Sequence, residues 1–146
     1  MDEELIKRHN EIIRKGDIII HGGDFTLHSN MKFVLEKYVN RLNGFHVFIR
    51  GSHDKWMGKV HHEIWEKTIE KQHVVVCHYA MRVWPRSHYG SWQLYGHSHG
   101  GLVPYEKQWD IGVDNNNFYP VSFDQLIEIM KNNSLINFKE SFEDHC

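Results

Sequence analysis

A pair of histidines flanked by glycine is the stretch of the sequence whose residue types most directly suit chemistry. His97 and His99 lie two residues apart, with Gly96 before them and Gly100 after them. If this segment is extended, side chains two residues apart leave on the same face. Two neutral imidazoles there can bind one metal ion, or one ion each of an adjacent pair. Taken alone, the pair fits a turn that happens to contain histidines equally well, so the rest of the sequence must decide.

Three further polar clusters follow short apolar runs. They are Asp24 in a Gly-Gly-Asp turn, the consecutive residues Ser52, His53 and Asp54, and His78. Short runs rich in β-branched and aromatic residues predict buried strands, and such runs cover residues 17–21, 45–50, 73–77 and 92–95. Because ligands bind outside the carboxyl ends of strands in α/β sheets, the three clusters and the His97 turn are expected to converge on one crevice.

The residue types in these clusters suit a transition metal. Imidazole nitrogens and carboxylate oxygens together favour Mn, Fe, Ni or Zn over Ca or Mg. A carboxylate such as that of Asp24 can span two cations, and two metal ions about 3.5–4 Å apart can activate water and stabilise an in-line displacement. Plainer alternatives exist for each residue, since Asp24 could cap the amides of its turn and His78 could bond a carbonyl group. A buried strand cysteine such as Cys77 is usually inert.

Helices and further strands must position these clusters. Apolar residues at helical spacing predict helices, and a Ser122/Gln125 capping box predicts the start of the last one. Ser29 or Asn30 is expected to cap the second helix. The expected helices cover residues 2–15, 31–42 and 122–131, with additional strands at 63–69 and 109–113, a loop at 80–91 and a loose tail at 132–146. The pattern predicts a single α/β domain over residues 1–146.

The composition narrows the classes of function. Hydrophobic residues make up 40% and charged residues 25%, and the net charge is −2, which is typical of a globular domain and gives no reason for general binding to nucleic acid or membranes. Two cysteines are too few for a disulfide framework and fit a reducing compartment. With no apolar run of membrane-spanning length and no signal peptide, we predict a cytoplasmic protein.

The order of the motifs closely resembles that of the calcineurin-like metallophosphoesterase family, particularly its small bacterial and phage members. The resemblance covers roughly residues 1–121 and includes the stretch Gly112 to Asn116. It is carried by Gly23-Asp24, Gly51-Ser52-His53-Asp54, Cys77-His78-Tyr79 and Gly96-His97-Ser98-His99. It implies a two-sheet α/β sandwich that hydrolyses phosphoester bonds with two metal ions.

The resemblance also implies a role for each residue of the motifs. Asp24 would bridge the two metals, His78 and His97 would hold one metal, and His99 would hold the other. His53 would contact the transferred phosphoryl group or protonate the leaving oxygen, and Asp54 would orient His53. Two arginines in the following loop, Arg82 and Arg86, could hold a substrate phosphate as charged donors, although both also fit solvated loop charges.

Two departures from the family pattern bear on activity. The family begins with a strand that ends in an Asp-x-His motif, and no Asp-x-His occurs in these 146 residues. Ser52 stands where the family has an asparagine metal ligand. We therefore expect a metallophosphoesterase sandwich shortened at its N-terminus, in which the site of Asp24, His78 and His97, with Ser52 or water, is better occupied than the site of Asp24 and His99.

Two functions from different classes are compatible with this pattern. The first is a metal-dependent phosphoesterase with reduced activity on a small phosphodiester or phosphomonoester. The second is a catalytically weak or inactive metal-binding or interaction protein that retains the fold. A structural zinc site lacks support because Cys77 and His78 are adjacent instead of at finger spacing. Without a first strand, the apolar strand at 17–21 would keep an open edge, so a homodimer or larger assembly is expected.

Overall fold

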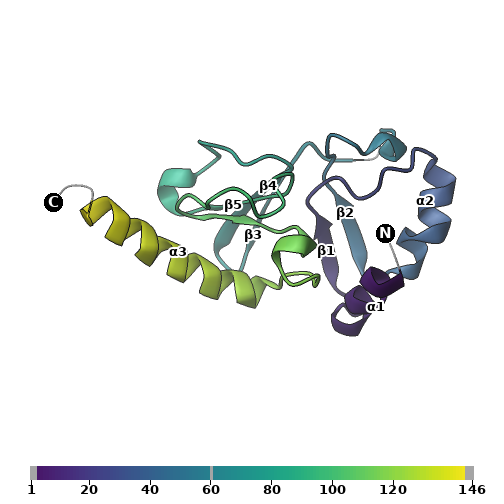
Figure 1. Cartoon of the computed structure of the whole chain (residues 1–146), viewed down its shortest axis with the longest axis horizontal. Coiled ribbons are helices and arrows are strands. Elements are labelled where there is room, and N and C mark those ends of the chain that lie inside the picture. Colours follow the sequence, from purple (N-terminus) through teal and green to yellow (C-terminus); the bar gives the residue numbers. More distant parts are fainter. Residues whose placement is uncertain (1–2, 60, 144–146) are drawn as a thin grey trace.

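The chain folds into two layers, and each layer combines a β-sheet with one or two helices. The computed structural model describes residues 3–59 and 61–143 (Figure 1). Within these residues, three α-helices and six strands form a two-stranded sheet, β1-β2, and a four-stranded sheet in the order β3-β4-β5-β6. The expected mixed α/β fold with two sheets is thereby confirmed. None of the helices in the described residues combines the length and apolar character that are needed to cross a membrane.

The smaller layer is built on two parallel strands. Strand β1 (Ile18–His21) pairs with β2 (Phe45–Phe48) in a register that matches their first residues to each other. Helices α1 (Glu3–Ile12) and α2 (Met31–Lys37) cover the side of this sheet that faces away from the other layer (Figure 1). The buried core between them contains Ile6, Val34, Tyr38, Leu42, Trp56 and Met57.

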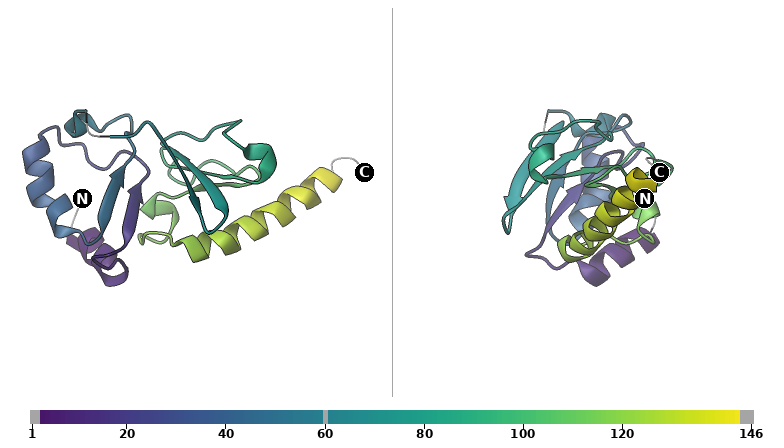
Figure 2. Two further views of the ribbon diagram at one scale, coloured as in Figure 1. Left: turned by 180° about the vertical axis from the view of Figure 1, so that it is seen from behind. Right: turned by 90° about the vertical axis from the view of Figure 1, so that its left-hand side faces the viewer.

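The larger layer combines a hairpin with two parallel strands. Strands β3 (Ile64–Ile69) and β4 (Gln72–Cys77) are antiparallel, and β5 (Trp92–Tyr95) and β6 (Gln108–Asp110) continue the sheet in parallel. Helix α3 (Phe123–Glu143) runs alongside this sheet, as both views in Figure 2 show. The core of this layer contains Ile49, Val74, Val76, Trp92, Leu94, Leu126 and Met130.

Local capping signals predicted two helix starts correctly. The Asn30 side chain accepts a hydrogen bond from the Phe33 backbone N–H at 3.0 Å, which begins α2. Ser122 and Gln125 form the reciprocal capping box at the start of α3, with bonds of 2.8 and 3.1 Å. Helix ends were less well predicted, because α2 stops at Lys37 and a short 3₁₀ turn, Val39–Arg41, replaces its last predicted turn.

The C-terminal helix is longer than the sequence pattern indicated. A loose tail was expected after residue 131, but α3 continues to Glu143. The segment from 122 to 143 contains neither glycine nor proline, so nothing in it stops a helix that has already started. Residues 144–146 of the expected tail lie outside the described residues.

Strand ends from both layers meet at the junction between them. The Gly96 N–H, after β5, donates to the His78 carbonyl oxygen, after β4, at 2.9 Å. The His78 ring in turn reaches the carbonyl oxygen of Gly22, after β1, at 2.9 Å. The predicted convergence of the turns is therefore found, but it joins two separate sheets instead of one sheet edge.

Candidate metal centre

Three side chains from three different turns come together at the junction. Asp24, His78 and His97 each offer one ligand atom, and these atoms lie within 4.8 Å of one another. The His78 Nε2 atom is 3.2 Å from the Asp24 Oδ2 atom and 3.2 Å from the His97 Nδ1 atom. Two imidazole nitrogens and one carboxylate oxygen form a donor set that suits Mn, Fe, Ni or Zn. The sequence predicted these three residues as ligands of one metal.

The orientation of His78 leaves a lone pair directed at this group. The His78 ring is buried, with 1% of the residue exposed, and its Nδ1 lies 2.9 Å from the Gly22 carbonyl oxygen. Since a carbonyl oxygen can only accept, Nδ1 carries the proton, and Nε2 of the neutral ring is a lone-pair donor. That lone pair and the Asp24 carboxylate face each other, and a cation between them would stabilise both.

Two glycines let the turns approach each other closely. A Cβ atom at Gly23 would collide with the His78 imidazole, and one at Gly51 would collide with the backbone nitrogen and carboxylate of Asp24. Gly23 also has a φ of 104°, which side chains disfavour. Close packing of these turns, and hence the short distances within the group, requires glycine at both positions.

Backbone strain is also present at this site. Asp24 has a φ of 55° and His97 a φ of 62°, so two of the three candidate ligands occupy the left-handed region. For residues other than glycine this conformation costs about 1 kcal/mol or more each, and such strain clusters at functional sites. The surrounding hydrogen bonds must therefore hold both residues in place.

Asp54 supplies the main restraint on the Asp24 turn. Its carboxylate is 1% exposed. It accepts hydrogen bonds of 2.6 to 3.1 Å from the backbone N–H groups of Asp24, Phe25 and Gly51 and from the Trp56 indole. The expected role of orienting His53 is not supported, because the His53 ring is not among the partners that Asp54 has in the described structure. The carboxylate binds one backbone donor of its own loop, Gly51, and two of the turn after β1.

Ser52 and His53 both contact the Asp24 carboxylate. The His53 backbone N–H donates to Oδ1 at 2.8 Å, and the Ser52 hydroxyl donates to Oδ2 at 3.4 Å. Both residues are exposed, and the roles predicted for the His53 ring stay predictions. The Ser52 hydroxyl lies against the carboxylate of a candidate ligand, and its predicted part in metal binding stays a prediction.

His99 is not part of the three-residue group and is bonded to Asp114 instead. Its Nδ1 lies 2.6 Å from the Asp114 carboxylate, and this hydrogen bond and the charge of Asp114 raise the pKa of His99. The segment is a turn instead of a strand, since both His97 and His99 have positive φ. The extended segment that would place both rings on one face is therefore not formed, and the second metal site stays a prediction.

Asp110 and Asp114 were not identified as site residues from the sequence. Asp110 is buried, and it accepts hydrogen bonds from the Ser98 hydroxyl at 3.1 Å and the Gly100 N–H at 2.9 Å, which fixes the turn that carries His97. A carboxylate at the end of a strand would have marked Asp110 as a site residue. The sequence placed Asp110 inside a strand predicted to continue to Val113, whereas β6 ends at Asp110.

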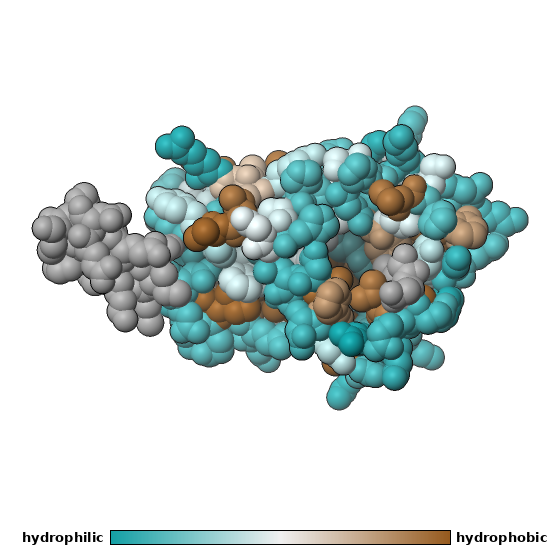
Figure 3. Space-filling view, in the orientation of Figure 1, coloured by the Kyte–Doolittle hydropathy of each residue, from teal (hydrophilic) through white to brown (hydrophobic). Residues whose placement is uncertain are grey.

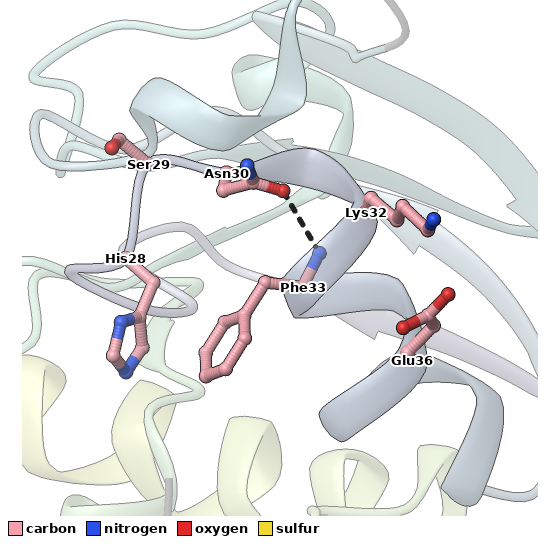
Figure 4. A pocket seen from close by; sticks show the side chains of 6 residues that line it. All are labelled: His28, Ser29, Asn30, Lys32, Phe33 and Glu36. Atoms are coloured by element: carbon pink, nitrogen blue, oxygen red, sulfur yellow. Dashed lines mark hydrogen bonds between the residues drawn. The ribbon is translucent and has the colours of Figure 1, made fainter.

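The remaining candidates lie away from the three-residue group. Arg82 and Arg86 are exposed in the loop at 80–91, and within the described structure neither side chain is bonded to Asp24, His78 or His97. A shallow hollow at the start of α2, shown in Figure 4, contains a single imidazole, that of His28, beside the ring of Phe33. It therefore lacks the several ligands that a metal ion needs.

Comparisons with known proteins identify a similar fold but give no information on the activity. No protein-family model matches the chain, and no curated protein matches it. The chain is similar to the crystal structure of a protein of unknown function, AQ665, from Aquifex aeolicus, with a TM-score of 0.65 and 16% sequence identity over 86% of this chain and 83% of that one. At this identity the likeness shows a shared fold alone.

Proposed function

We propose that the chain is a metal-dependent phosphoesterase with a metallophosphoesterase-type sandwich, acting on a small phosphodiester or phosphomonoester. The observation that supports this most directly is the group of Asp24, His78 and His97, whose ligand atoms lie within 4.8 Å of one another. The group would hold a divalent transition metal such as Mn, Fe, Ni or Zn. When bound, such an ion supplies Lewis-acid chemistry toward a phosphoryl group and a water nucleophile.

The neighbouring residues would bind and orient the substrate. Asp24 is held by the His53 N–H and by Asp54, so its free carboxylate oxygen is fixed for ligation. The exposed His53 ring would contact the phosphoryl group or donate a proton to the leaving oxygen. Arg82 and Arg86, which are exposed after β4, are the candidates for longer-range contacts with a substrate phosphate, and a cytoplasmic location is part of the same proposal.

A second function has a specific observation in its favour. His99 is bonded to Asp114, so the described residues assemble one group of three ligands and not the two adjacent sites that clamp both oxygens of an in-line displacement. A metal-binding or interaction protein with weak or no catalysis would need only the one group. Both functions therefore require metal binding, and a measurement of phosphoester hydrolysis distinguishes between them.

The decisive experiment measures metal and activity on the same sample. Purified protein is loaded with Mn or Zn, desalted, and analysed for metal per chain and for hydrolysis of bis(4-nitrophenyl) phosphate. His97→Ala is expected to lose most of the metal. His88→Ala, at an exposed histidine in the loop at 80–91, is expected to retain it. Folded wild-type protein without bound metal would refute both functions, and bound metal without turnover would favour the second.

A further inference from the structure

A groove with a mainly apolar lining lies between β1 and the larger layer, and Asp24 and His97 are also among its lining residues. Its volume is about 550 Å³. The space-filling view shows apolar residues around a hollow near the middle of this face, where the two layers meet (Figure 3). Leu5 and Leu42 of the smaller layer line it on one side, and Leu94 and Leu126 of the larger layer line it as well. A ligand in this groove would therefore meet apolar side chains from both layers.

One edge of β1 is open toward this groove. On its other edge, β1 pairs with β2: the carbonyl oxygens of Asp17 and His21 accept from Phe45 and Ile49 at 2.7 and 3.0 Å. Successive residues of a strand direct their backbone groups to opposite sides, so Ile18, Ile20 and Gly22 face away from β2. The Gly22 carbonyl is bonded to His78.

The backbone groups of Ile18 and Ile20 have no such partner. Among the described residues, no hydrogen bond is formed by the outward N–H or C=O of either residue. Both residues line the groove. An apolar small molecule placed there would bury these groups unsatisfied, which costs about 1–3 kcal/mol for each. An extended peptide would supply both a donor and an acceptor for them.

We propose that the groove binds one extended apolar peptide segment, which adds as a strand beside β1. Peptides bind open sheet edges in this way, with main-chain hydrogen bonds on the edge and side chains in the adjoining pockets. Because apolar side chains of both layers line the groove beside β1, the segment is apolar on both faces and rich in β-branched residues, as in a fully buried strand. The groove has walls from both layers, so a single segment fits it better than the edge of another folded sheet.

The test uses a blocked peptide with the sequence Val-Ile-Val-Ile-Thr-Lys, whose lysine provides solubility. Binding is measured by calorimetry, and amide hydrogen exchange is followed by NMR. The peptide is expected to bind and to slow exchange at the amides of Ile18 and Ile20. The amide of Ile19, which already faces β2, serves as an internal reference. Absence of binding, or binding without protection of Ile18 and Ile20, would overturn the proposal.

A fully N-methylated peptide separates strand addition from simple apolar binding. It keeps the same side chains, but it has no backbone N–H on either edge that could donate to β1. It is expected to lose binding. Binding equal to that of the unmethylated peptide would show that the groove takes apolar ligands without strand pairing, and would refute the proposal.

A pair of matched variants locates the binding site on the protein. Val113 lines the groove and is 37% exposed, whereas Val103 is 81% exposed and does not line it. Val113→Arg is expected to weaken peptide binding about tenfold, because it places a charge on an apolar wall. Val103→Arg is expected to leave it unchanged, and circular dichroism checks that both variants fold. Unaltered binding by Val113→Arg would show that the peptide binds elsewhere. Because Asp24 and His97 also line the groove, both measurements are made on metal-free protein, and their outcome is then independent of the proposed function.

Discussion

Asp54 shows how a single buried carboxylate can set the geometry of a site without touching a substrate. It accepts four N–H donors from the two turns that follow β1 and β2. One of these donors belongs to Asp24, whose backbone is left-handed. The hydrogen bonds therefore offset the strain of that conformation and keep the Asp24 carboxylate directed at His78.

Replacing this carboxylate with an amide is expected to be costly. Asp54→Asn substitutes an N–H₂ donor for one acceptor. Either the N–H groups of Asp24 and Gly51, or those of Phe25 and the Trp56 indole, are then left facing another donor in a buried setting. We expect a loss of about 3 kcal/mol in the free energy of unfolding, measured by urea denaturation of metal-free protein. Asp114→Asn is the control, since the Asp114 side chain is 37% exposed. A loss below about 1 kcal/mol for Asp54→Asn would contradict the restraining role.

His53 provides a test of catalysis that leaves the metal group intact. Its contact with Asp24 is made by the backbone N–H, which a substitution does not remove. If the ring acts as a proton donor or phosphoryl contact, His53→Ala should lower turnover about a hundredfold while metal per chain stays constant. Ser52→Ala, at the adjacent exposed position, is the comparison. Full activity in His53→Ala would exclude the ring from the reaction.

Three histidines join the elements of the smaller layer. They are His9 on α1, His21 on β1 and His46 on β2. The His46 Nε2 lies 3.2 Å from the Leu42 carbonyl oxygen and must donate to it, which leaves Nδ1 of the neutral ring as an acceptor for His21 Nε2 at 2.9 Å. His9 and His46 are stacked with ring centroids 6.0 Å apart. This arrangement lets neutral rings at His21 and His46 satisfy the hydrogen bond between them.

The buried pair makes stability depend on pH. Burial lowers the pKa of His21 well below its ordinary value of 6.5, and the neighbouring His46 and His9 lower it further. Burial also lowers the pKa of His46. As the pH falls below about 6.5, the unfolded chain takes up protons that the folded chain does not. The stabilisation is therefore complete above pH 6.5 and is lost progressively as the pH falls below it.

A substitution at His21 is expected to make the stability of the protein less dependent on pH. His21→Phe keeps an aromatic ring stacked on Phe48, which lies 4.5 Å away between centroids, but it removes the titrating group. Urea denaturation at pH 7.5 and at pH 5.0 should show a smaller loss of stability in the variant than in the wild type. His88→Phe, at an exposed histidine, should behave as the wild type. An equal loss in both variants would mean that other groups cause the acid sensitivity.

Exposed apolar side chains at the starts of β1 and β2 also matter for the whole molecule. Ile18 and Phe45, the first residues of these strands, are 55% and 66% exposed. Exposed apolar side chains promote association, so a homodimer or larger assembly remains our prediction. Light scattering at micromolar concentration should give a mass above that of one chain, and Ile18→Lys should reduce it. Val103→Lys is the matched control, and a well-behaved wild-type monomer would contradict the prediction.

Short-range patterns in the sequence were sufficient for most of the elements. The strand at 92–95 was predicted with the bounds that β5 has, and both capping motifs begin helices where expected. These features depend on residues within about four positions of each other, where side-chain period and local hydrogen bonds dominate. The meeting of Asp24, His78 and His97 was also predictable, because each directly follows a strand and strand ends gather in α/β folds.

Only the tertiary structure decided which side chains face one another. His99 turns to Asp114, fifteen residues away, and the Asp54 carboxylate binds the Asp24 backbone, thirty residues away, instead of the adjacent His53 ring. No repeating pattern of residues along the sequence specifies these two contacts. They depend on left-handed turns and on how two separate sheets pack against each other, and this packing also leaves the backbone of Ile18 and Ile20 open to the groove. The sequence by itself thus determined the strands and the candidate ligands, while the packing of the two layers determined how those ligands are arranged and which strand edge stays unpaired.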